Sequence, residues 1–173
     1  MKRHPALALI LLAFATPAAA ERLEFDHRLY PPLQQVLDGG DKDMIDFNGD
    51  NPARVVDLIA VKGRSAKDWT EAMEIVSIAR PKSMRTARDW MNLMAQQAPE
   101  GCRGANTIIA EDATSVTFER RLPDCPAARA GLGIYRLVTG KRSWFQLAVL
   151  TKGELDAASR SEWLSLLASA HIR

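Results

Sequence analysis

Histidine and cysteine are scarce in this chain. Three histidines and two cysteines occur among 173 residues, which excludes a disulfide-dense miniprotein and leaves few ligands for a zinc site. No apolar run reaches the length of a membrane span. Hydrophobic residues make up 47% and charged residues 25%, so the chain is neither disordered nor collagen-like. The net charge of +2 gives no reason to expect a nucleic acid partner.

Residues 1–20 have the three parts of a secretory signal peptide. Lys2 and Arg3 form a positive start, an apolar stretch follows from Ala6 to Ala15, and a small-residue cleavage motif ends at Ala20. We expect cleavage after Ala20 and a mature chain in the periplasm or secreted beyond it. Removal of Lys2 and Arg3 from the 23 basic residues makes their number equal to that of the 21 acidic ones, so the mature chain has no net charge.

The two cysteines, Cys102 and Cys125, remain after this cleavage. In an oxidising compartment an even pair predicts a disulfide bond. The bond would tie the start of one β-hairpin to the end of its second strand and stabilise the fold by about 3 kcal/mol. A redox pair or a metal site is the alternative, but the wide spacing and the lack of further ligands disfavour it.

Hydrophobic periodicity predicts a single α+β domain over residues 53–173, preceded by an irregular segment over residues 21–52. The segment has a short helix after Pro31 and Pro32 and an acidic loop over 41–52. Strands are expected over 55–61, 69–78, 106–110, 115–121, 133–139 and 143–150, and helices over 83–97 and 160–171, the latter after a capping box at Ser159 and Glu162. Short connections favour antiparallel pairing. The expected architecture is an antiparallel sheet of about six strands with the middle and C-terminal helices packed on it, and with the four tryptophans in the core.

This order of elements resembles that of known proteins. Trp69, Thr70 and Glu71 open a strand, a helix and a cysteine-flanked strand pair follow, and the final helix carries Trp163 and Leu167. From about residue 55 onward, the chain resembles small exported bacterial proteins of uncharacterised function and is similar to the PsbP/Mog1-like α/β/α sandwich. The resemblance implies a binding or accessory role more than catalysis, and it assigns no catalytic residue.

The acidic loop has the alternating oxygen ligands of a calcium-binding loop. These residues occupy positions 1, 3, 5 and 12 of such a loop: Asp46, Asn48, Asp50 and Asp57. Position 6 is Asn51 where glycine is usual, position 12 is shorter than the usual glutamate, and no helix is expected before the loop. A solvated turn rich in Asp and Asn is the alternative interpretation.

Basic residues gather at the expected start of the middle helix. They are Arg80, Lys82, Arg85 and Arg88. Cations at this end oppose the helix dipole, and free N–H groups converge there, which predicts an anion-binding site for a phosphate, a lipid head group or an acidic protein patch. The alternative is that these long side chains extend into water.

No catalytic motif is present. His27 and His171 are the histidines left after cleavage, and neither lies in a nucleophile motif. We therefore expect a non-catalytic binding or accessory protein of the bacterial envelope, without a cofactor, whose partner is an envelope protein or a small anionic ligand. A small hydrolase that uses carboxylates is one alternative, although Glu71 and Glu74 would face opposite sides of a strand. An immunity-type protein that binds a toxin is the other.

Overall fold

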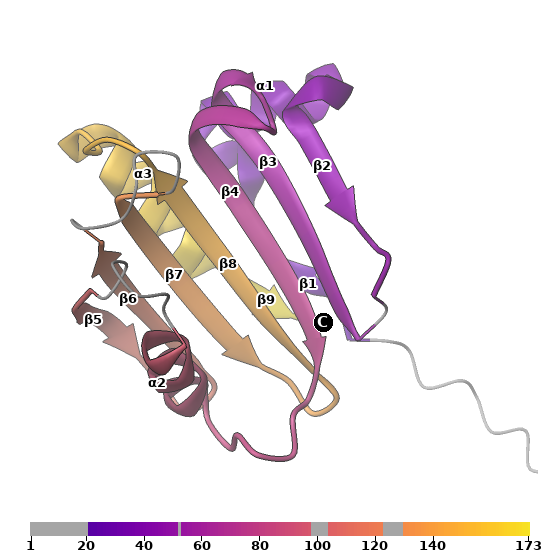
Figure 1. Cartoon of the computed structure of the whole chain (residues 1–173), viewed down its shortest axis with the longest axis vertical. Coiled ribbons are helices and arrows are strands. Elements are labelled where there is room, and N and C mark those ends of the chain that lie inside the picture. Colours follow the sequence, from indigo (N-terminus) through magenta and orange to yellow (C-terminus); the bar gives the residue numbers. More distant parts are fainter. Residues whose placement is uncertain (1–20, 52, 98–103, 123–129) are drawn as a thin grey trace, which may run out of the picture.

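A seven-stranded antiparallel sheet forms the centre of the protein, in the order β2-β3-β4-β8-β7-β6-β5 (Figure 1). The computed structural model describes residues 21–51, 53–97, 104–122 and 130–173. The strands of this sheet are β2 (Ile45–Asn48), β3 (Arg54–Ser65), β4 (Asp68–Ala79), β5 (Asn106–Glu111), β6 (Ser115–Arg121), β7 (Leu132–Thr139) and β8 (Ser143–Thr151). The predicted α+β class, with an antiparallel sheet and a C-terminal helix, is confirmed.

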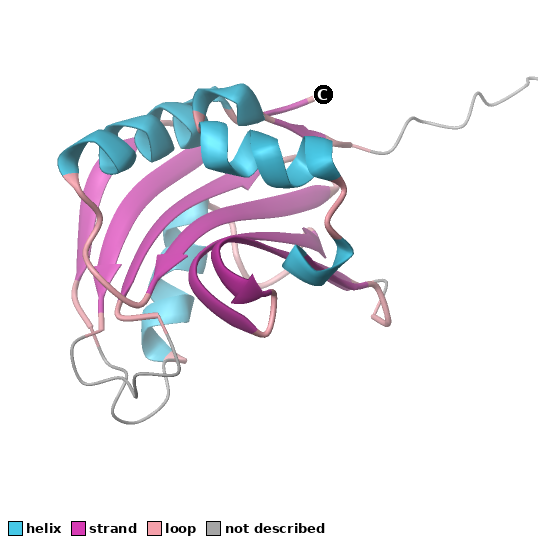
Figure 2. Cartoon of the chain, turned by 90° about the horizontal axis from the view of Figure 1, so that it is seen from above, coloured by secondary structure: helices cyan, strands magenta, loops and turns pink. Residues whose placement is uncertain are grey.

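The helices lie on both faces of this sheet (Figure 2). Helices α1 (Pro31–Gly39) and α3 (Ala157–Ser169) pack on one face, here called the α1/α3 face, and α2 (Ala87–Gln96) packs on the other, the α2 face. Short strands β1 (Leu23–Glu24) and β9 (His171–Ile172) pair with each other near the two ends of the described chain. None of the helices in the described ranges is long and apolar enough to span a bilayer.

Two apolar clusters form the core, one on each face. On the α1/α3 face, Leu33 and Trp163 pack against Met73 and Leu147. On the α2 face, Trp90 packs in the second cluster with residues of β6, β7 and β8. Three of the four tryptophans, Trp90, Trp144 and Trp163, are buried as expected, while Trp69 is half-buried.

The first cluster contains a buried carboxylate. Glu71 is 4% exposed and accepts hydrogen bonds from the Tyr30 hydroxyl, from Trp163 Nε1 at 2.8 Å and from Lys62 Nζ at 2.7 Å. A β-bulge between Ala60 and Lys62 brings the lysine opposite Glu71. Burial, together with the adjacent Glu71, raises the pKa of Tyr30 to about 12. The donors compensate the buried charge, so this cluster is a structural link between α1, α3, β3 and β4.

The segment predicted as an acidic loop contains strand β2. Ile45 pairs with Ile59 and packs against the first cluster, while Phe47 is 70% exposed. The sheet therefore has seven strands where about six were expected. The alternation of Ile45, Asp46, Phe47 and Asn48 is that of an edge strand, but its polar residues and the neighbouring Gly49 favoured a loop.

Two predicted helix starts were also displaced. Helix α3 begins a turn earlier than expected, because the Asp156 carboxylate accepts from Ser159 N at 2.9 Å and so forms the N-cap in place of Ser159. Helix α2 begins later, because Thr86 and Asp89 form a capping box at its start. Polar side chains that bond to the backbone fix both starts more strongly than the apolar pattern does.

Glu71 and Glu74 provide a matched test of the buried cluster. Glu71→Gln should lower the free energy of unfolding by about 2–3 kcal/mol, because it removes the charge that three donors are arranged around. Urea denaturation would measure the change. Glu74→Gln, on the other face of the same strand, should not lower stability, and equal losses in the two variants would contradict a structural role specific to Glu71.

Candidate functional site

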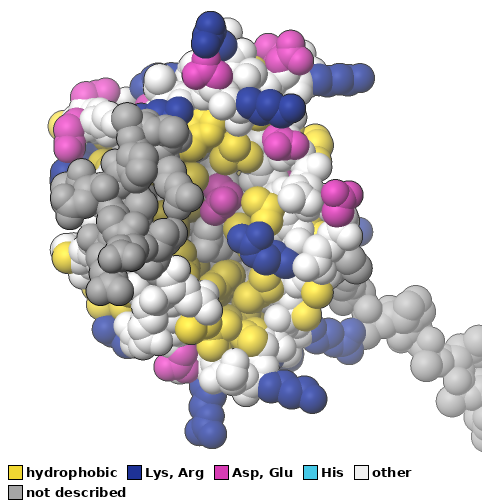
Figure 3. Space-filling view, in the orientation of Figure 1, with side chains coloured by type: hydrophobic (Ala, Val, Ile, Leu, Met, Phe, Trp, Pro, Cys, Tyr) yellow, Lys and Arg dark blue, Asp and Glu magenta, His cyan; other side chains and the backbone are white. Residues whose placement is uncertain are grey.

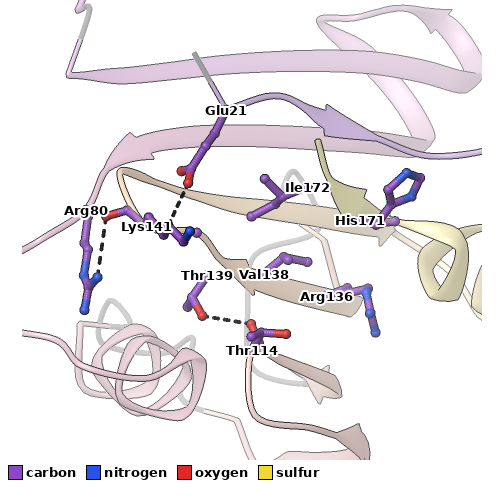
Figure 4. A pocket seen from close by; sticks show the side chains of 11 residues that line it. Glu21, Arg80, Thr114, Arg136, Val138, Thr139, Lys141, His171 and Ile172 are labelled. Carbon is purple, nitrogen blue, oxygen red and sulfur yellow. Dashed lines mark hydrogen bonds between the residues drawn. The ribbon is translucent and has the colours of Figure 1, made fainter. Parts of the chain in front are cut away.

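A pocket of about 480 Å³ lies where the β7–β8 turn, the end of β4 and strand β9 meet (Figure 4). Segments far apart in the sequence contribute to it. Its lining residues are Glu21, Arg80, Thr114, Arg136, Val138, Thr139, Gly140, Lys141, Ala170, His171 and Ile172. A concave site with apolar walls and a few polar groups is the usual form of a small-molecule site.

Three cationic side chains line this pocket. Arg80 and Arg136 lie toward opposite ends of it, with Lys141 between them (Figure 4). None of the three forms an ion pair with a carboxylate in the described part of the chain. The Arg80 guanidinium donates instead to the Lys141 carbonyl at 3.5 Å. The pocket is therefore electropositive.

Arg136 is the most buried of these three cations. It comes from the middle of β7, on the α1/α3 face, and is half-buried. Its Nη1 donates to Thr117 Oγ1 at 3.2 Å, while its Nε is buried without a partner among the described residues. Burial lowers the pKa of the guanidinium, against the opposing effect of the Asp112 charge. A buried cation with an unused donor is costly for a protein to keep unless an anion binds it.

The one carboxylate in the lining is already used by the backbone. Glu21 accepts hydrogen bonds from the backbone N–H groups of Lys141, Arg142 and Ser143 at 2.8, 2.9 and 2.8 Å. Desolvation acts to raise the pKa of this carboxyl, but the three backbone hydrogen bonds outweigh it and lower the pKa. Glu21 therefore fixes the turn that carries Lys141 and does not neutralise the lysine.

The wall across the pocket from Glu21 is formed by the turn between β5 and β6, which Asp112 stabilises. The Asp112 carboxylate accepts from the backbone and the hydroxyl of both Thr114 and Ser115, over distances of 2.7 to 3.0 Å. The Thr114 carbonyl in turn accepts from Thr139 Oγ1 at 2.9 Å, a contact drawn in Figure 4. This wall is therefore preorganised by local hydrogen bonds.

The four basic residues predicted as an anion site are separated by the structure. Arg80 lines the pocket, Lys82 and Arg85 lie exposed in the loop before α2, and Arg88 pairs with Glu111, with Nε at 2.8 Å from Oε1. The backbone N–H groups of Arg85 and Thr86 donate to the Asp89 carboxylate at 2.8 and 3.0 Å. A carboxylate of the chain itself thus occupies the α2 start, and an anion site there stays a prediction.

The predicted calcium ligands are not brought together. Asp46 and Asn48 face the same side of β2, whereas Asp57 pairs with Phe47 and so faces the other side of the sheet. Asp50 lies in the loop beyond the strand. Among the residues that the structure describes, no three His, Cys, Asp or Glu side chains lie close enough to share a metal ion. Calcium binding gains no support from this geometry.

The two cysteines, Cys102 and Cys125, lie outside the described residues, so the disulfide stays a prediction. The strand ends nearest to them are described. Asn106 of β5 pairs with Arg120 of β6, and a Cβ placed on Gly104 would overlap the backbone oxygen of Arg121. The chain therefore leaves the β5–β6 pair from two adjacent points.

Sequence reasoning missed most of the pocket. Arg136 and Lys141 were not singled out, and Glu21 was noted only as the first residue after the cleavage motif. One signal was available, since Arg136 is a charged residue within an otherwise apolar strand. His171 is exposed at the rim, where Nε2 lies 3.7 Å from Glu24 Oε2.

No protein-family model matches this chain, and no curated protein or solved structure matches it significantly.

We predict that the stability contributed by the Asp112 turn is lost at low pH. Hydrogen bonds from Ser115 and Thr114 lower the pKa of Asp112 from its usual 3.8 to about 2. Because the folded-state pKa is the lower one, the stabilisation is complete above about pH 4 and is lost as the pH falls toward 2. Asp112→Asn should therefore lower the melting temperature at neutral pH and flatten its pH dependence in this range. Identical profiles for Asp112→Asn and the exposed-loop control Asp50→Asn would contradict this.

Proposed function

We propose that this is an exported, non-catalytic binding protein that holds a small polyanionic ligand in the basic pocket. The half-buried Arg136, which has an unused donor and forms no ion pair in the described chain, is the observation that carries the proposal. Arginine offers a planar fork of donors to carboxylate or phosphate oxygens, and Lys141 adds a point charge. The separation of Arg80 from Arg136 favours a ligand with two or more anionic groups.

The character of these groups favours binding over catalysis. Arginine keeps its proton throughout the physiological range, so Arg80 and Arg136 supply fixed charge and do not transfer protons. The Glu21 carboxylate is held by three backbone donors and is a poor base there. The carboxylate pair considered for a hydrolase does not assemble, because Glu71 contacts residues of the α1/α3 face while Glu74 contacts Gln146 on the other.

Export to an oxidising compartment is the second part of the proposal. We propose cleavage after Ala20, location in the periplasm or beyond it, and a Cys102–Cys125 disulfide. Two features support this proposal. Glu21, the first mature residue, is bonded to the β7–β8 turn, and Arg22 exchanges backbone hydrogen bonds with Arg173 at 3.1 and 2.9 Å. The ends of β5 and β6 that lead to the two cysteines are adjacent.

Anion binding can be measured by calorimetry with citrate and pyrophosphate. Both should bind, and Arg136→Met should weaken the affinity about tenfold or more, because a charge-assisted hydrogen bond contributes about 1.5–3 kcal/mol. Lys141→Gln, at an exposed position, should also weaken it. The neighbouring Arg142→Gln is the matched control and should bind as the unaltered protein does. Absence of binding at millimolar concentration, or equal losses in Lys141→Gln and Arg142→Gln, would overturn the proposed pocket.

Export can be tested by expressing the full chain in a Gram-negative host and recording intact mass in the periplasmic fraction. The expected species begins at Glu21 and lacks two hydrogens relative to the reduced chain. Cys102→Ser should expose one reactive thiol and lower the free energy of unfolding by about 3 kcal/mol. A retained amino terminus, or two reactive thiols in the periplasmic material, would contradict this part of the proposal without affecting the pocket.

A further inference from the structure

Glu74 is a half-buried carboxyl group that the proposed pocket does not use. It lies near the middle of β4 on the α2 face, where it pairs with Leu58 of β3 and Ala148 of β8. Its polar contact within the described chain is one neutral donor, Gln146 Nε2, at 2.6 Å. Glu71, three residues earlier, has three donors, one of them cationic. The negative charge of Glu71 is therefore well compensated, whereas that of Glu74 is compensated only weakly.

The surroundings of Glu74 are apolar. Val56 and Val76 form the neighbouring register pair on the same face, and Ile78 follows along β4. Val56, Leu58 and Ile78 are half-buried, so part of their surface is open to a ligand. Figure 3 views this face and shows apolar side chains gathered there, with an acidic side chain and a basic side chain among them.

The charged and titratable groups around Glu74 leave its charge incompletely balanced. Arg54, on β3, is exposed and acts on Glu74 only through the longer-range field. Tyr135 of β7, whose own pKa is raised to about 12 by burial and by Glu74, cannot supply positive charge. Arg120 of β6 donates to the Met94 carbonyl at 3.1 Å. Burial consequently raises the pKa of Glu74, against the weaker effects of Arg54 and Gln146.

We propose that the α2 face is a second binding site, for an amphiphilic amine whose ammonium group pairs with Glu74 and whose aliphatic part lies over Val56, Leu58 and Ile78. A carboxylate in apolar surroundings is costly without a cation. An alkylammonium ion supplies the missing charge and covers apolar surface in one step, whereas an alkyl carboxylate would place like charges together. The site is independent of the basic pocket, because Arg136 lies on the opposite face.

The test uses three probes of equal chain length: octylammonium, octanol and octanoate. Calorimetry at neutral pH should show octylammonium binding at least tenfold more tightly than octanol, and no binding of octanoate. Methyl groups of Val56, Leu58 and Ile78 should show the largest NMR shift changes. Acidification through the raised pKa of Glu74 should weaken octylammonium binding, because protonation removes the charge that the ligand pairs with.

Matched variants separate this site from non-specific binding. Glu74→Gln should reduce octylammonium affinity at least tenfold while the protein stays as stable as before. Asp57→Asn removes a half-buried carboxylate from the adjacent strand but on the other face, and it should leave the affinity unchanged, as should Arg136→Met. Equal affinity for octylammonium and octanol, or full affinity in Glu74→Gln, would overturn the proposal. Failure of citrate binding would overturn the basic pocket alone.

Discussion

The α1/α3 layer depends on one carboxylate that is buried beneath it. Glu71 receives donors from Tyr30 at the start of α1, from Lys62 on β3 and from Trp163 on α3. The rings of Tyr30 and Trp163 also contact each other, with centroids 4.0 Å apart. Apolar packing alone tolerates sliding of a helix on a sheet, whereas hydrogen bonds to a single carboxylate fix both helices in position. The β-bulge that brings Lys62 to Glu71 belongs to the same hydrogen-bonded cluster.

The basic pocket follows from this arrangement. Once α3 is fixed, the chain reaches β9 directly after it, and β9 pairs with β1. That pairing places Glu21 against the β7–β8 turn, where its carboxylate holds three backbone N–H groups. Lys141 is therefore presented to the pocket by a turn that is bonded to the first residues of the fold. A site supported by such secondary contacts is positioned more rigidly than one formed by surface side chains alone.

Features of this protein that depend on neighbouring residues could be predicted from the sequence, whereas features that depend on tertiary contacts could not. Local patterns were sufficient for α1, α2, α3 and six strands of the sheet, because hydrophobic periodicity is a property of adjacent residues. Strand β2 was missed because an edge strand needs few apolar residues, and the start of α3 was missed because Asp156 competes with Ser159 for the cap. Arg136 and Lys141 belong to one hairpin, but Glu21 reaches them only through tertiary contacts, so no local spacing predicts the pocket. Arg80 was predicted to bind an anion because of its charge, but the other residues predicted for that site do not line the pocket.

Strand parity explains how the protein can hold two charges of opposite sign that form no ion pair in the described chain. Leu147 of β8 is the register partner of Arg136 on β7 and of Ile75 on β4, and all three side chains face the α1/α3 side. Glu74 is the adjacent residue on β4 and therefore faces the α2 side. The sheet itself thus prevents the guanidinium and the carboxylate from neutralising each other, although only β8 separates their strands. Keeping both charges in this state costs stability that apolar residues at the two positions would recover, and the two binding sites that we propose would give a physical reason to retain them.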